Sequence, residues 1–413
     1  MFSNSPRTGQ GFFDQKGGGV HPLDISSRRK TLGILAAGTI LALTASPALA
    51  GLGRASRWTQ AGGDSGRSNS NAGERILDAS NVSALEIEWV RDSGRAMPVF
   101  SNGRGYAGTE IFDPADGSGI APLDAPAVDD SSPALLGGRV VATSWDDPSL
   151  SAMDADTGNL LWSKPFGDAG SSPAVARNTI FSSANGVLRA VDPASGSVDW
   201  KRRVSTGDTS DPVVSGGLVI VRAPLDKDGS SSAQRVIALD AAEGDILWKR
   251  KTAYATTGYR DSVVAADGMV LTAKGSALAA LDLEDGSTLW ETDVSCCDHA
   301  PAIASGVVYT TQWTSEGGTL HAIDARTGAI IWTTTGTDFS DGVSVANGVV
   351  YLAAMGLQAF DASSGEKLLD LDIGVPWHAP VVVDGTVYLA IENGPESPPA
   401  TGEGLYAFRL PRP

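Results

Sequence analysis

Two adjacent cysteines, Cys296 and Cys297, are the residues whose types and spacing suggest chemistry most directly. A disulfide between neighbouring residues closes a small ring only through a strained peptide, and backbone strain of this kind concentrates at functional sites. Asp298 and His299 follow at once in the chain and add a carboxylate and an imidazole. The segment is therefore a candidate ligand-binding site, although a structural clip or two reduced thiols would give the same sequence.

The composition narrows the chemistry that such a site can perform. Two cysteines and four histidines leave little room for a zinc cluster, and no Cys-x-x-Cys-His sequence is present for covalent haem, so metal chemistry would have to use oxygen ligands. The formal charge of -17 argues against nucleic acid and anionic membrane surfaces as partners, because a phosphate-binding face needs a surplus of lysine and arginine. The net charge thus favours a neutral or cationic partner.

The elements that must position these residues form a repeat. Alternating apolar residues lead to an aspartate, a glycine follows four positions later, and a second apolar run usually ends in tryptophan, which indicates a strand, a tight turn and a strand. We interpret the glycine as the left-handed residue of the turn and the aspartate as a cap for turn amides. The aspartates of the six copies are Asp154, Asp192, Asp240, Asp282, Asp324 and Asp361, and the glycines are Gly158, Gly196, Gly244, Gly286, Gly328 and Gly365.

A second signature counts the units independently, since each new unit begins at a recognisable first strand. Eight such starts follow one another at intervals of about 40 residues, inside the range expected of four-stranded propeller blades. They lie at Pro98, Pro133, Pro173, Pro212, Val263, Pro301, Gly342 and Pro380. The sequence therefore predicts an all-β fold, an eight-bladed β-propeller of four-stranded antiparallel blades.

The two ends of the repeat region complete one another. The last unit ends at Leu405–Pro411 without an outer strand, and Leu85–Val90 is an outer strand without a unit before it. We expect these N- and C-terminal strands to pair, which removes the exposed edges of an open array and favours a monomer. The first blade lacks the repeat tryptophan, whose expected place is near Leu123 and Asp124.

The first 50 residues have the features of an export signal. Arg28 and Arg29 precede an apolar run from Leu32 to Leu43, and Ala48–Ala50 supplies a small-residue cleavage pattern. We predict a twin-arginine-type signal peptide at 1–50, a polar lead-in at 51–84 and a single propeller at 85–413. The protein would be exported to an extracellular, periplasmic or cell-wall space with no membrane span after signal removal, although an uncleaved anchor is the alternative.

These repeats resemble the pyrroloquinoline quinone (PQQ)-like repeat β-propellers, and Trp58–Asn71 is similar to the lead-in usual in that family. The family includes quinone-dependent alcohol and sugar dehydrogenases as well as non-catalytic scaffolds such as an assembly lipoprotein of outer membranes. The resemblance implies the fold over essentially the whole mature chain, but function has to be argued from the site.

The dehydrogenases of this family carry a vicinal disulfide against the cofactor, and theirs is likewise followed by aspartate, as Asp298 follows here. On that resemblance the chain would bind PQQ and Ca²⁺, and calcium needs six to eight oxygen ligands. The sequence departs from the family downstream, where His299–Ala302 replaces Asn-Arg-Gly, and it offers no counterpart of the catalytic aspartate. The carboxylates that could converge on calcium are Asp130, Asp211, Asp298 and Asp341.

Topology places the candidate site at one end of the channel. The connections from each outer strand to the next inner strand lie on the face opposite the aspartate–glycine turns, and rigidly positioned loops are where binding usually occurs. We predict that three tryptophans outside the repeat position, a histidine equivalent to His299 and one arginine lie in these connections. They are Trp145, Trp313, Trp377, His378 and Arg260.

Two functions from different classes fit this sequence. The first is an exported binding or scaffold protein that engages a protein or cell-wall partner through its channel-mouth face. The second is a small PQQ- and calcium-dependent alcohol or sugar dehydrogenase with the cysteine pair at the cofactor. The chain is rich in repeats and poor in catalytic motifs, which favours the first, and no catalytic residue is assigned.

Overall fold

Consecutive strands of the chain form eight similar sheets in the computed structural model. The structure describes residues 57–92, 95–124, 131–144, 148–166, 171–225, 233–253, 263–294, 299–314, 317–337, 342–392 and 403–412. The chain divides into two units, residues 1–52 and 53–413, and all described residues lie in the second. Within the described ranges, no helix is long and apolar enough to cross a membrane.

Blades 1 to 4 follow the predicted pattern of four antiparallel strands, which run outward from the channel in chain order. Blade 1 has β3 (Val99–Ser101), β4 (Arg104–Ala107), β5 (Glu110–Phe112) and β6 (Gly119–Pro122). Blade 2 has β7 (Ala134–Leu136), β8 (Arg139–Ser144), β9 (Ser149–Asp154) and β10 (Leu160–Pro165). Blade 3 has β11 (Ala174–Ala176), β12 (Thr179–Ala184), β13 (Val187–Val191) and β14 (Val198–Arg203). Blade 4 has β15 (Val213–Ser215), β16 (Leu218–Pro224), β17 (Ala233–Asp240) and β18 (Ile246–Ala253).

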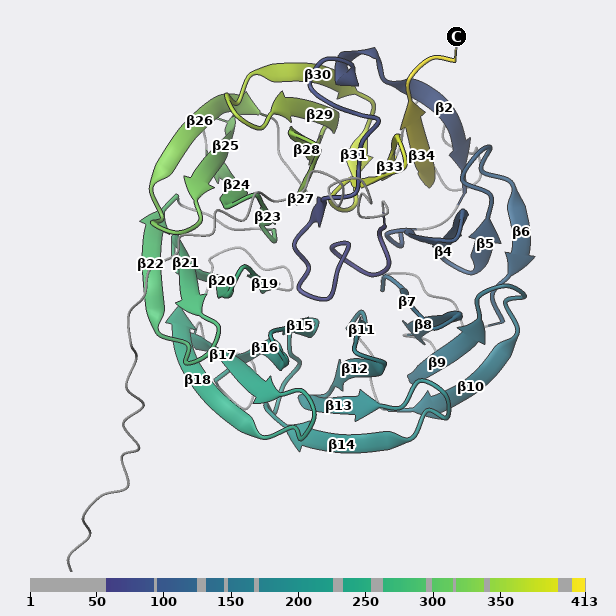
Figure 1. The fold of residues 1–413 in the computed structure, drawn as a ribbon, viewed down its shortest axis with the longest axis vertical. Coiled ribbons are helices and arrows are strands. Elements are labelled where there is room, and N and C mark those ends of the chain that lie inside the picture. Colours follow the sequence, from purple (N-terminus) through teal and green to yellow (C-terminus); the bar gives the residue numbers. More distant parts are fainter. Residues whose placement is uncertain are drawn as a thin grey trace, which may run out of the picture. The chain divides into compact units, whose positions relative to one another are not determined.

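Blades 5 to 8 complete the ring (Figure 1). Blade 5 has β19 (Val264–Ala266), β20 (Met269–Lys274), β21 (Ala277–Asp282) and β22 (Thr288–Asp293). Blade 6 has β23 (Ala302–Ala304), β24 (Val307–Thr314), β25 (Gly317–Asp324) and β26 (Ile330–Thr337). Blade 7 has β27 (Gly342–Ala346), β28 (Val349–Ala354), β29 (Gly356–Asp361) and β30 (Lys367–Asp372). Blade 8 has β31 (Val375–Pro376), β32 (Val381–Val383), β33 (Thr386–Glu392), β34 (Glu403–Arg409) and, as its outer strand, β2 (Glu86–Arg91).

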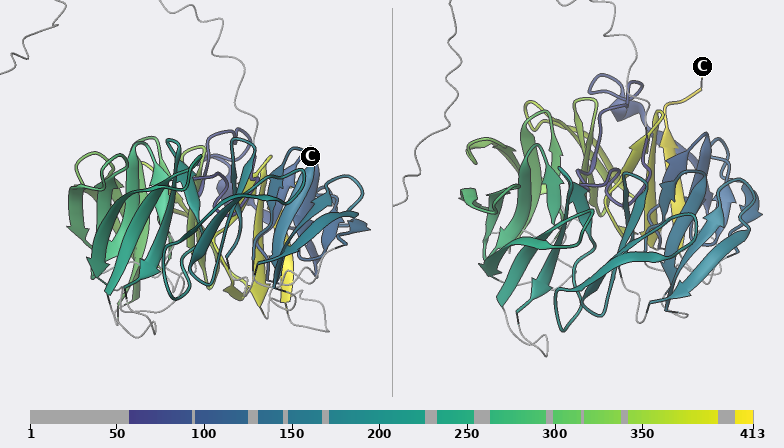
Figure 2. Two further views of the ribbon diagram at one scale, coloured as in Figure 1. Left: turned by 90° about the horizontal axis from the view of Figure 1, so that it is seen from below. Right: turned by 60° about the horizontal axis from the view of Figure 1, so that its bottom comes forward.

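The predicted closure of the ring is confirmed. Strand β2 pairs antiparallel with β34, with Glu86 opposite Arg409 and Arg91 opposite Leu405. The first and last strands of the repeat region therefore belong to one blade, and the eight-bladed all-β fold is the one the repeat count predicts. Figure 2 shows the same strands edge-on, running between the two faces of the ring.

Tryptophans dock each blade onto the next. The Trp162 indole Nε1 donates to the Pro193 carbonyl oxygen at 3.0 Å, and its ring covers Gly196, where an added Cβ would lie 2.7 Å from the ring. Five further tryptophans make the same bond to the residue after the turn aspartate of the following blade. These are Trp89, Trp200, Trp248, Trp290 and Trp332. The motif glycine is thus required both for its left-handed backbone, with φ near 70°, and for the indole that packs on it.

Two of the eight joins lack this tryptophan. Leu369 takes its place in blade 7 and packs with Leu77, Val82 and Leu85 from the residues before β2. In blade 1 the tryptophan is missing as predicted, and its position is Ala121, two residues before Leu123. Ala121 pairs with Ile111 in blade 1, just as Trp162 pairs with Ala152 in blade 2. The position lies two residues earlier than expected because blade 1 has its own aspartate–glycine turn at Asp113–Gly117.

The turn aspartates cap their turns as predicted. Asp192 Oδ1 accepts bonds from the Ser195 amide and hydroxyl, and these bonds lower the pKa of its carboxyl. The pKa values of three further turn aspartates are lowered in the same way. The main cause is the side-chain hydrogen bond from Thr327 for Asp324 and from Ser363 for Asp361, and the bond from the Thr157 amide for Asp154. The carboxylates are therefore structural in the blades where these bonds are seen.

Acid should destabilise the ring through these carboxylates. Their folded pKa values lie below the unfolded value of 3.8, so the stability they contribute is present above that pH and is lost as the pH falls through the folded values. We expect the urea midpoint to fall below about pH 4. A variant with Asp154, Asp192 and Asp324 changed to asparagine keeps a capping oxygen without the titration, and its midpoint should depend less on pH. An equally steep dependence in this variant would contradict the assignment.

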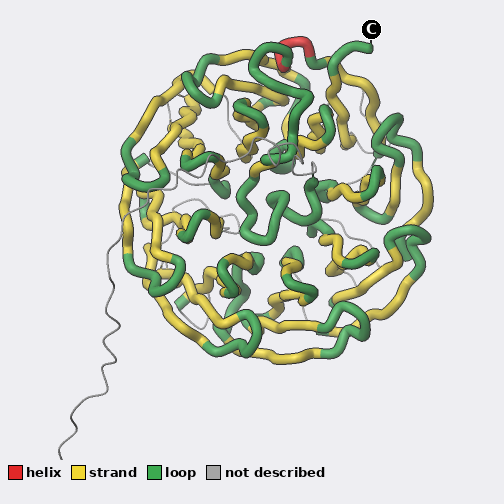
Figure 3. Tube along the Cα trace, in the orientation of Figure 1, coloured by secondary structure: helices red, strands yellow, loops and turns green. Residues whose placement is uncertain are grey.

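The described part of the lead-in fills the centre of the channel (Figures 1 and 3). Its backbone or side chains bond to a residue of the inner strand in every blade. The main-chain amides of Phe100, Leu135, Val214, Ala265, Ile303 and Val345 donate to lead-in carbonyl oxygens, and that of Val175 donates to Gln60 Oε1. In blade 8 the Asn71 side-chain amide donates to the Val382 carbonyl oxygen at 2.8 Å.

The lead-in contains small residues because its backbone lies very close to the inner strands. The Gly66 carbonyl accepts from Ala265, and a Cβ on Gly66 would lie 2.1 Å from the Ala265 carbonyl oxygen. Trp58 is fully buried against the core between blades 1 and 8. The short strand β1 (Ser70–Asn71) pairs in parallel with β27, and a single 3-10 turn, η1 (Val82–Ala84), leads towards β2. Small residues thus let one segment contact all eight inner strands.

Glu74 fixes the end of the lead-in. Its side chain is fully buried, Oε1 accepts from the amides of Arg75, Ile76 and Leu77, and Oε2 accepts from the amide of Gly385 in blade 8. In Glu74→Gln the side-chain NH₂ would face one of these N–H groups and leave it without an acceptor. We expect a loss of about 1–3 kcal/mol in the free energy of unfolding, measured by urea denaturation. The exposed Glu86→Gln is the control and should change it by less than about 0.5 kcal/mol.

Candidate binding site at the channel mouth

The connections that lead into the inner strands are built on a shared serine position. Ser131 and Ser171 each lie two residues before the proline of their blade and donate through Oγ to carbonyl oxygens of the second strand, Thr143 and Ser183. Ser210 holds the same place and accepts from the Arg222 amide. These bonds fix the connections to the rigid blades. His299 and His378 occupy the equivalent position in blades 6 and 8.

Trp377 and His378 form the best-defined part of the predicted site. Trp377 is held by its amide, which donates to the Ala390 carbonyl at 3.0 Å, and its ring packs partly on the core of blades 1 and 8. The Arg95 guanidinium lies over this ring, 3.9 Å from the centroid, and His378 Nε2 bonds the Arg95 carbonyl oxygen. Two connections from neighbouring blades are thus joined into one half-buried cluster of aromatic, cationic and imidazole groups.

Asp211 is paired with the lead-in. Its Oδ2 accepts from Arg67 Nη1 at 2.6 Å, and its Oδ1 accepts from the Ser172 amide at 2.8 Å. The Ser172 hydroxyl in turn accepts from the Ser132 amide. Arg67 therefore reaches from the lead-in to the connections of blades 3 and 4, and Ser172 links these to the connection of blade 2. A guanidinium beside Asp211 disfavours calcium there, because two cations would compete for one carboxylate.

Burial keeps two of the histidines neutral. It lowers the pKa of His299 to about 4, so its imidazole is uncharged at neutral pH. It also lowers the pKa of His321, which lies on β25 with Nδ1 bonded to Thr333 and Nε2 to Gln312. Both nitrogens of His321 are already used by neighbouring strands, which makes it a core residue.

Several predicted site residues lie outside the described residues, and their roles stay predictions. They are Trp145, Arg260, Cys296, Cys297, Asp298, Asp130 and Asp341. Within the part of the chain that the structure describes, no group of three or more histidine, cysteine, aspartate or glutamate side chains could hold a metal ion. The prediction that Trp313 lies in a connection is wrong. Its backbone pairs with Gly318 near the end of β24, because this hairpin is longer than the repeat pattern indicates.

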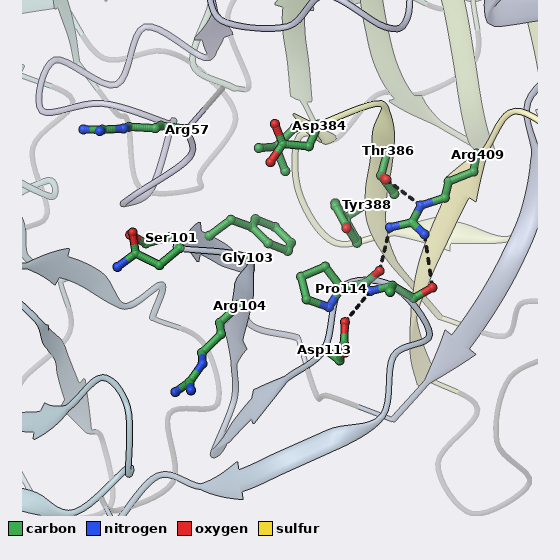
Figure 4. A pocket seen from close by; sticks show the side chains of 14 residues that line it. Arg57, Ser101, Gly103, Arg104, Asp113, Pro114, Asp384, Thr386, Tyr388 and Arg409 are labelled. Atoms are coloured by element: carbon green, nitrogen blue, oxygen red, sulfur yellow. Dashed lines mark hydrogen bonds between the residues drawn. The ribbon is translucent and has the colours of Figure 1, made fainter. Parts of the chain in front are cut away.

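A cavity of about 460 Å³ lies at the seam between blades 8 and 1, and sequence reasoning missed it (Figure 4). Phe100 and Tyr388 stack in its wall with ring centroids 4.4 Å apart. Arg409 spans the seam: Nε donates to Thr386 Oγ1, and both terminal nitrogens donate to the carbonyls of Pro114 and Ala115. All three nitrogens of Arg409 are engaged in closing the ring, so we assign it a structural role.

Comparison with known proteins places this ring in a family. A family model described as outer membrane protein assembly factor BamB matches residues 146–312 and 316–397, more than half of the chain. The chain belongs to this family of PQQ-like repeat propellers. Among the family, it is 26% identical over 170 residues to the assembly factor BamB of Bordetella pertussis, covering 40% of this chain and 41% of that protein. It is 25% identical over 233 residues to BamB of Yersinia pestis, covering 49% of this chain and 56% of that protein.

The chain therefore spans about half the length of the curated relatives it matches. Among solved structures, a europium-containing methanol dehydrogenase superposes with a TM-score of 0.69 at 13% identity, covering 86% of this chain and 98% of that one. BamB from Moraxella catarrhalis superposes with a TM-score of 0.56 at 14% identity, covering 79% of this chain and 99% of that one. Identities this low show a shared fold alone, for the dehydrogenase and the assembly factor alike.

Proposed function

We propose that this chain is an exported binding or scaffold protein that engages a protein or cell-wall partner through its channel-mouth face. The observation that carries the proposal is the cluster of Trp377, Arg95 and His378 on connections tied to rigid blades. Tryptophan and arginine are enriched among residues that dominate binding energy at protein interfaces. A half-buried tryptophan already stacked by an arginine offers such a contact without further ordering.

The relatives also support a binding or scaffold role. The curated proteins that this chain resembles at 25–26% identity are named assembly factors, which fits a chain that works by binding. The alternative, a PQQ- and calcium-dependent dehydrogenase, has less support from the described residues. Asp211 is the only one of the four candidate calcium ligands that lies among them, and it is paired with Arg67.

Replacing Trp377 tests the proposal. The immobilised protein is exposed to a cell-envelope extract of its source organism, and the species retained at low micromolar protein is quantified. We expect Trp377→Ala to reduce that retention at least tenfold, because a buried aromatic anchor contributes about 2 kcal/mol or more. Trp377→Phe should keep part of it. Leu161→Ala, a change on the exposed flank of blade 2, is the control and should retain the partner fully.

Two outcomes would overturn the proposal. One is unchanged retention by Trp377→Ala at a temperature where circular dichroism shows the variant folded. The other is enzyme activity: if added PQQ and Ca²⁺ give cofactor absorbance and dye-linked alcohol oxidation by the purified protein, the dehydrogenase alternative is correct.

A further inference from the structure

Two neighbouring outer strands carry a concentration of positive charge that the net charge hides. Each repeat tryptophan of blades 3 and 4 is followed at once by three cations, whereas the other six outer strands hold at most one lysine or arginine each. The basic residues are Lys201, Arg202 and Arg203 on β14 and Lys249, Arg250 and Lys251 on β18. We call these six residues the basic flank.

Three of the six cations are used within the ring, among them Arg203, whose Nη1 donates to the carbonyl oxygens of Asn185 and Ser205. Arg202 Nε donates to the Gly244 carbonyl, and Arg250 Nε donates to the Gly286 carbonyl, so each holds the turn of the following blade. Because side chains alternate along a strand, the residues on either side of each arginine point the opposite way. Lys201, Lys249 and Lys251 are exposed, and their side-chain ammonium groups make no hydrogen bond or ion pair with another described residue.

Arginines on the next strands inward extend the positive surface. Arg189 lies opposite Lys201, and Arg235 lies opposite Lys251. Burial lowers the pKa of the Arg189 guanidinium, and the charge of nearby Arg203 lowers it further. Arg189 also lies over the Phe166 ring, 4.9 Å from its centroid, in an open groove of about 550 Å³ beside Lys201.

The shape of the basic flank distinguishes between anionic partners. Strands β14 and β18 end the strand order of their blades, so among the described residues each has one edge without a neighbouring strand. A peptide in extended conformation can lie along such an edge and place alternate side chains about 7 Å apart, the spacing of Lys249 and Lys251. A lipid bilayer is flat and could not enter the groove that Arg189 and Phe166 line.

We infer that the basic flank, Lys201 with Lys249 and Lys251 at its centre, is a docking surface for an extended acidic peptide segment of a partner protein. The overall charge of -17 does not prevent this, because charges farther away than about 8 Å are largely screened at physiological salt. The surface lies on the side of the ring, apart from the Trp377 cluster at the channel mouth.

The test uses a labelled ten-residue peptide of alternating glutamate and threonine, with its glutamine counterpart as the uncharged probe. Fluorescence anisotropy with the purified protein at 50 mM salt should show binding of the glutamate peptide, at least tenfold tighter than the glutamine one. Changing both Lys249 and Lys251 to glutamine should weaken binding at least fivefold. The control changes two other exposed cations, Arg57 and Arg326, to glutamine and should leave the affinity within twofold.

Three results would overturn the inference. The first is no binding of the glutamate peptide at 1 mM and low salt, and the second is equal weakening by the two double variants. The third is a preference for phosphatidylglycerol vesicles or duplex DNA, lost in the lysine double variant, without binding of the peptide. All variants change exposed side chains, and matching melting temperatures establish that they are folded.

Discussion

Trp162→Ala should lower the free energy of unfolding by about 3–5 kcal/mol, one of the two largest losses expected from a single change in this ring. Trp162 is 8% exposed, and its indole covers Gly196 of the next blade and donates its Nε1 hydrogen to the Pro193 carbonyl oxygen. Alanine would remove this packing and leave a cavity that the rigid turn cannot fill. Urea denaturation followed by tryptophan fluorescence and circular dichroism measures the loss.

The neighbouring residue provides the control for Trp162. Leu161 is 48% exposed on the same strand, so Leu161→Ala should cost less than about 1 kcal/mol. If the two variants were equally stable, the indole would not be the contact that joins blades 2 and 3, and the account of the blade joins would fail.

Arg67→Met should cost about 3 kcal/mol, because it leaves the Asp211 carboxylate largely buried without its cation. Methionine preserves the length of the side chain, so the loss reports the charge and the hydrogen bonds rather than a large cavity. The same urea measurement applies. The arginine also bonds the Ser172 carbonyl, and blades 3 and 4 should therefore loosen together.

A double-variant cycle separates the ion pair from packing. Adding Asp211→Asn to Arg67→Met removes the unpaired charge, so the double variant should be more stable than the sum of the two single losses predicts. Strict additivity of the two changes would contradict the role given to this pair.

Most of the fold could be predicted from local sequence patterns. The blade count and the ring closure follow from features that each unit repeats: an alternating strand, an aspartate–glycine turn and a start marked by Pro133 or its equivalents. Where the tryptophan is missing, the pattern locates its position only approximately, near Leu123 instead of at Ala121. Its blade could have been aligned by Asp113 and Gly117, which keep the spacing of the motif.

The role of the lead-in could not be predicted in the same way. Its contacts join Trp58 to blade 1 and Asn71 to blade 8, and no period within the segment indicates which strands it meets. The candidate site was predicted only in part: Trp377 and His378 lie together, but the partner that brings them together, Arg95, has no signal beyond its place in a connection. The basic flank was missed because net charge averages over the chain, although two runs of three cations after Trp200 and Trp248 are visible in the sequence.

The central claim is that the lead-in holds all eight inner strands, so that the ring is rigid and binding is left to its loops and flank. Hydrogen–deuterium exchange of Gly66→Val tests it most directly, because any side chain at Gly66 would meet the Ala265 carbonyl. We predict faster exchange at the inner strands of several blades together, including Val214, Ile303 and Val345, while the outer strands stay protected. Unchanged exchange at these inner strands in the folded variant would contradict the claim.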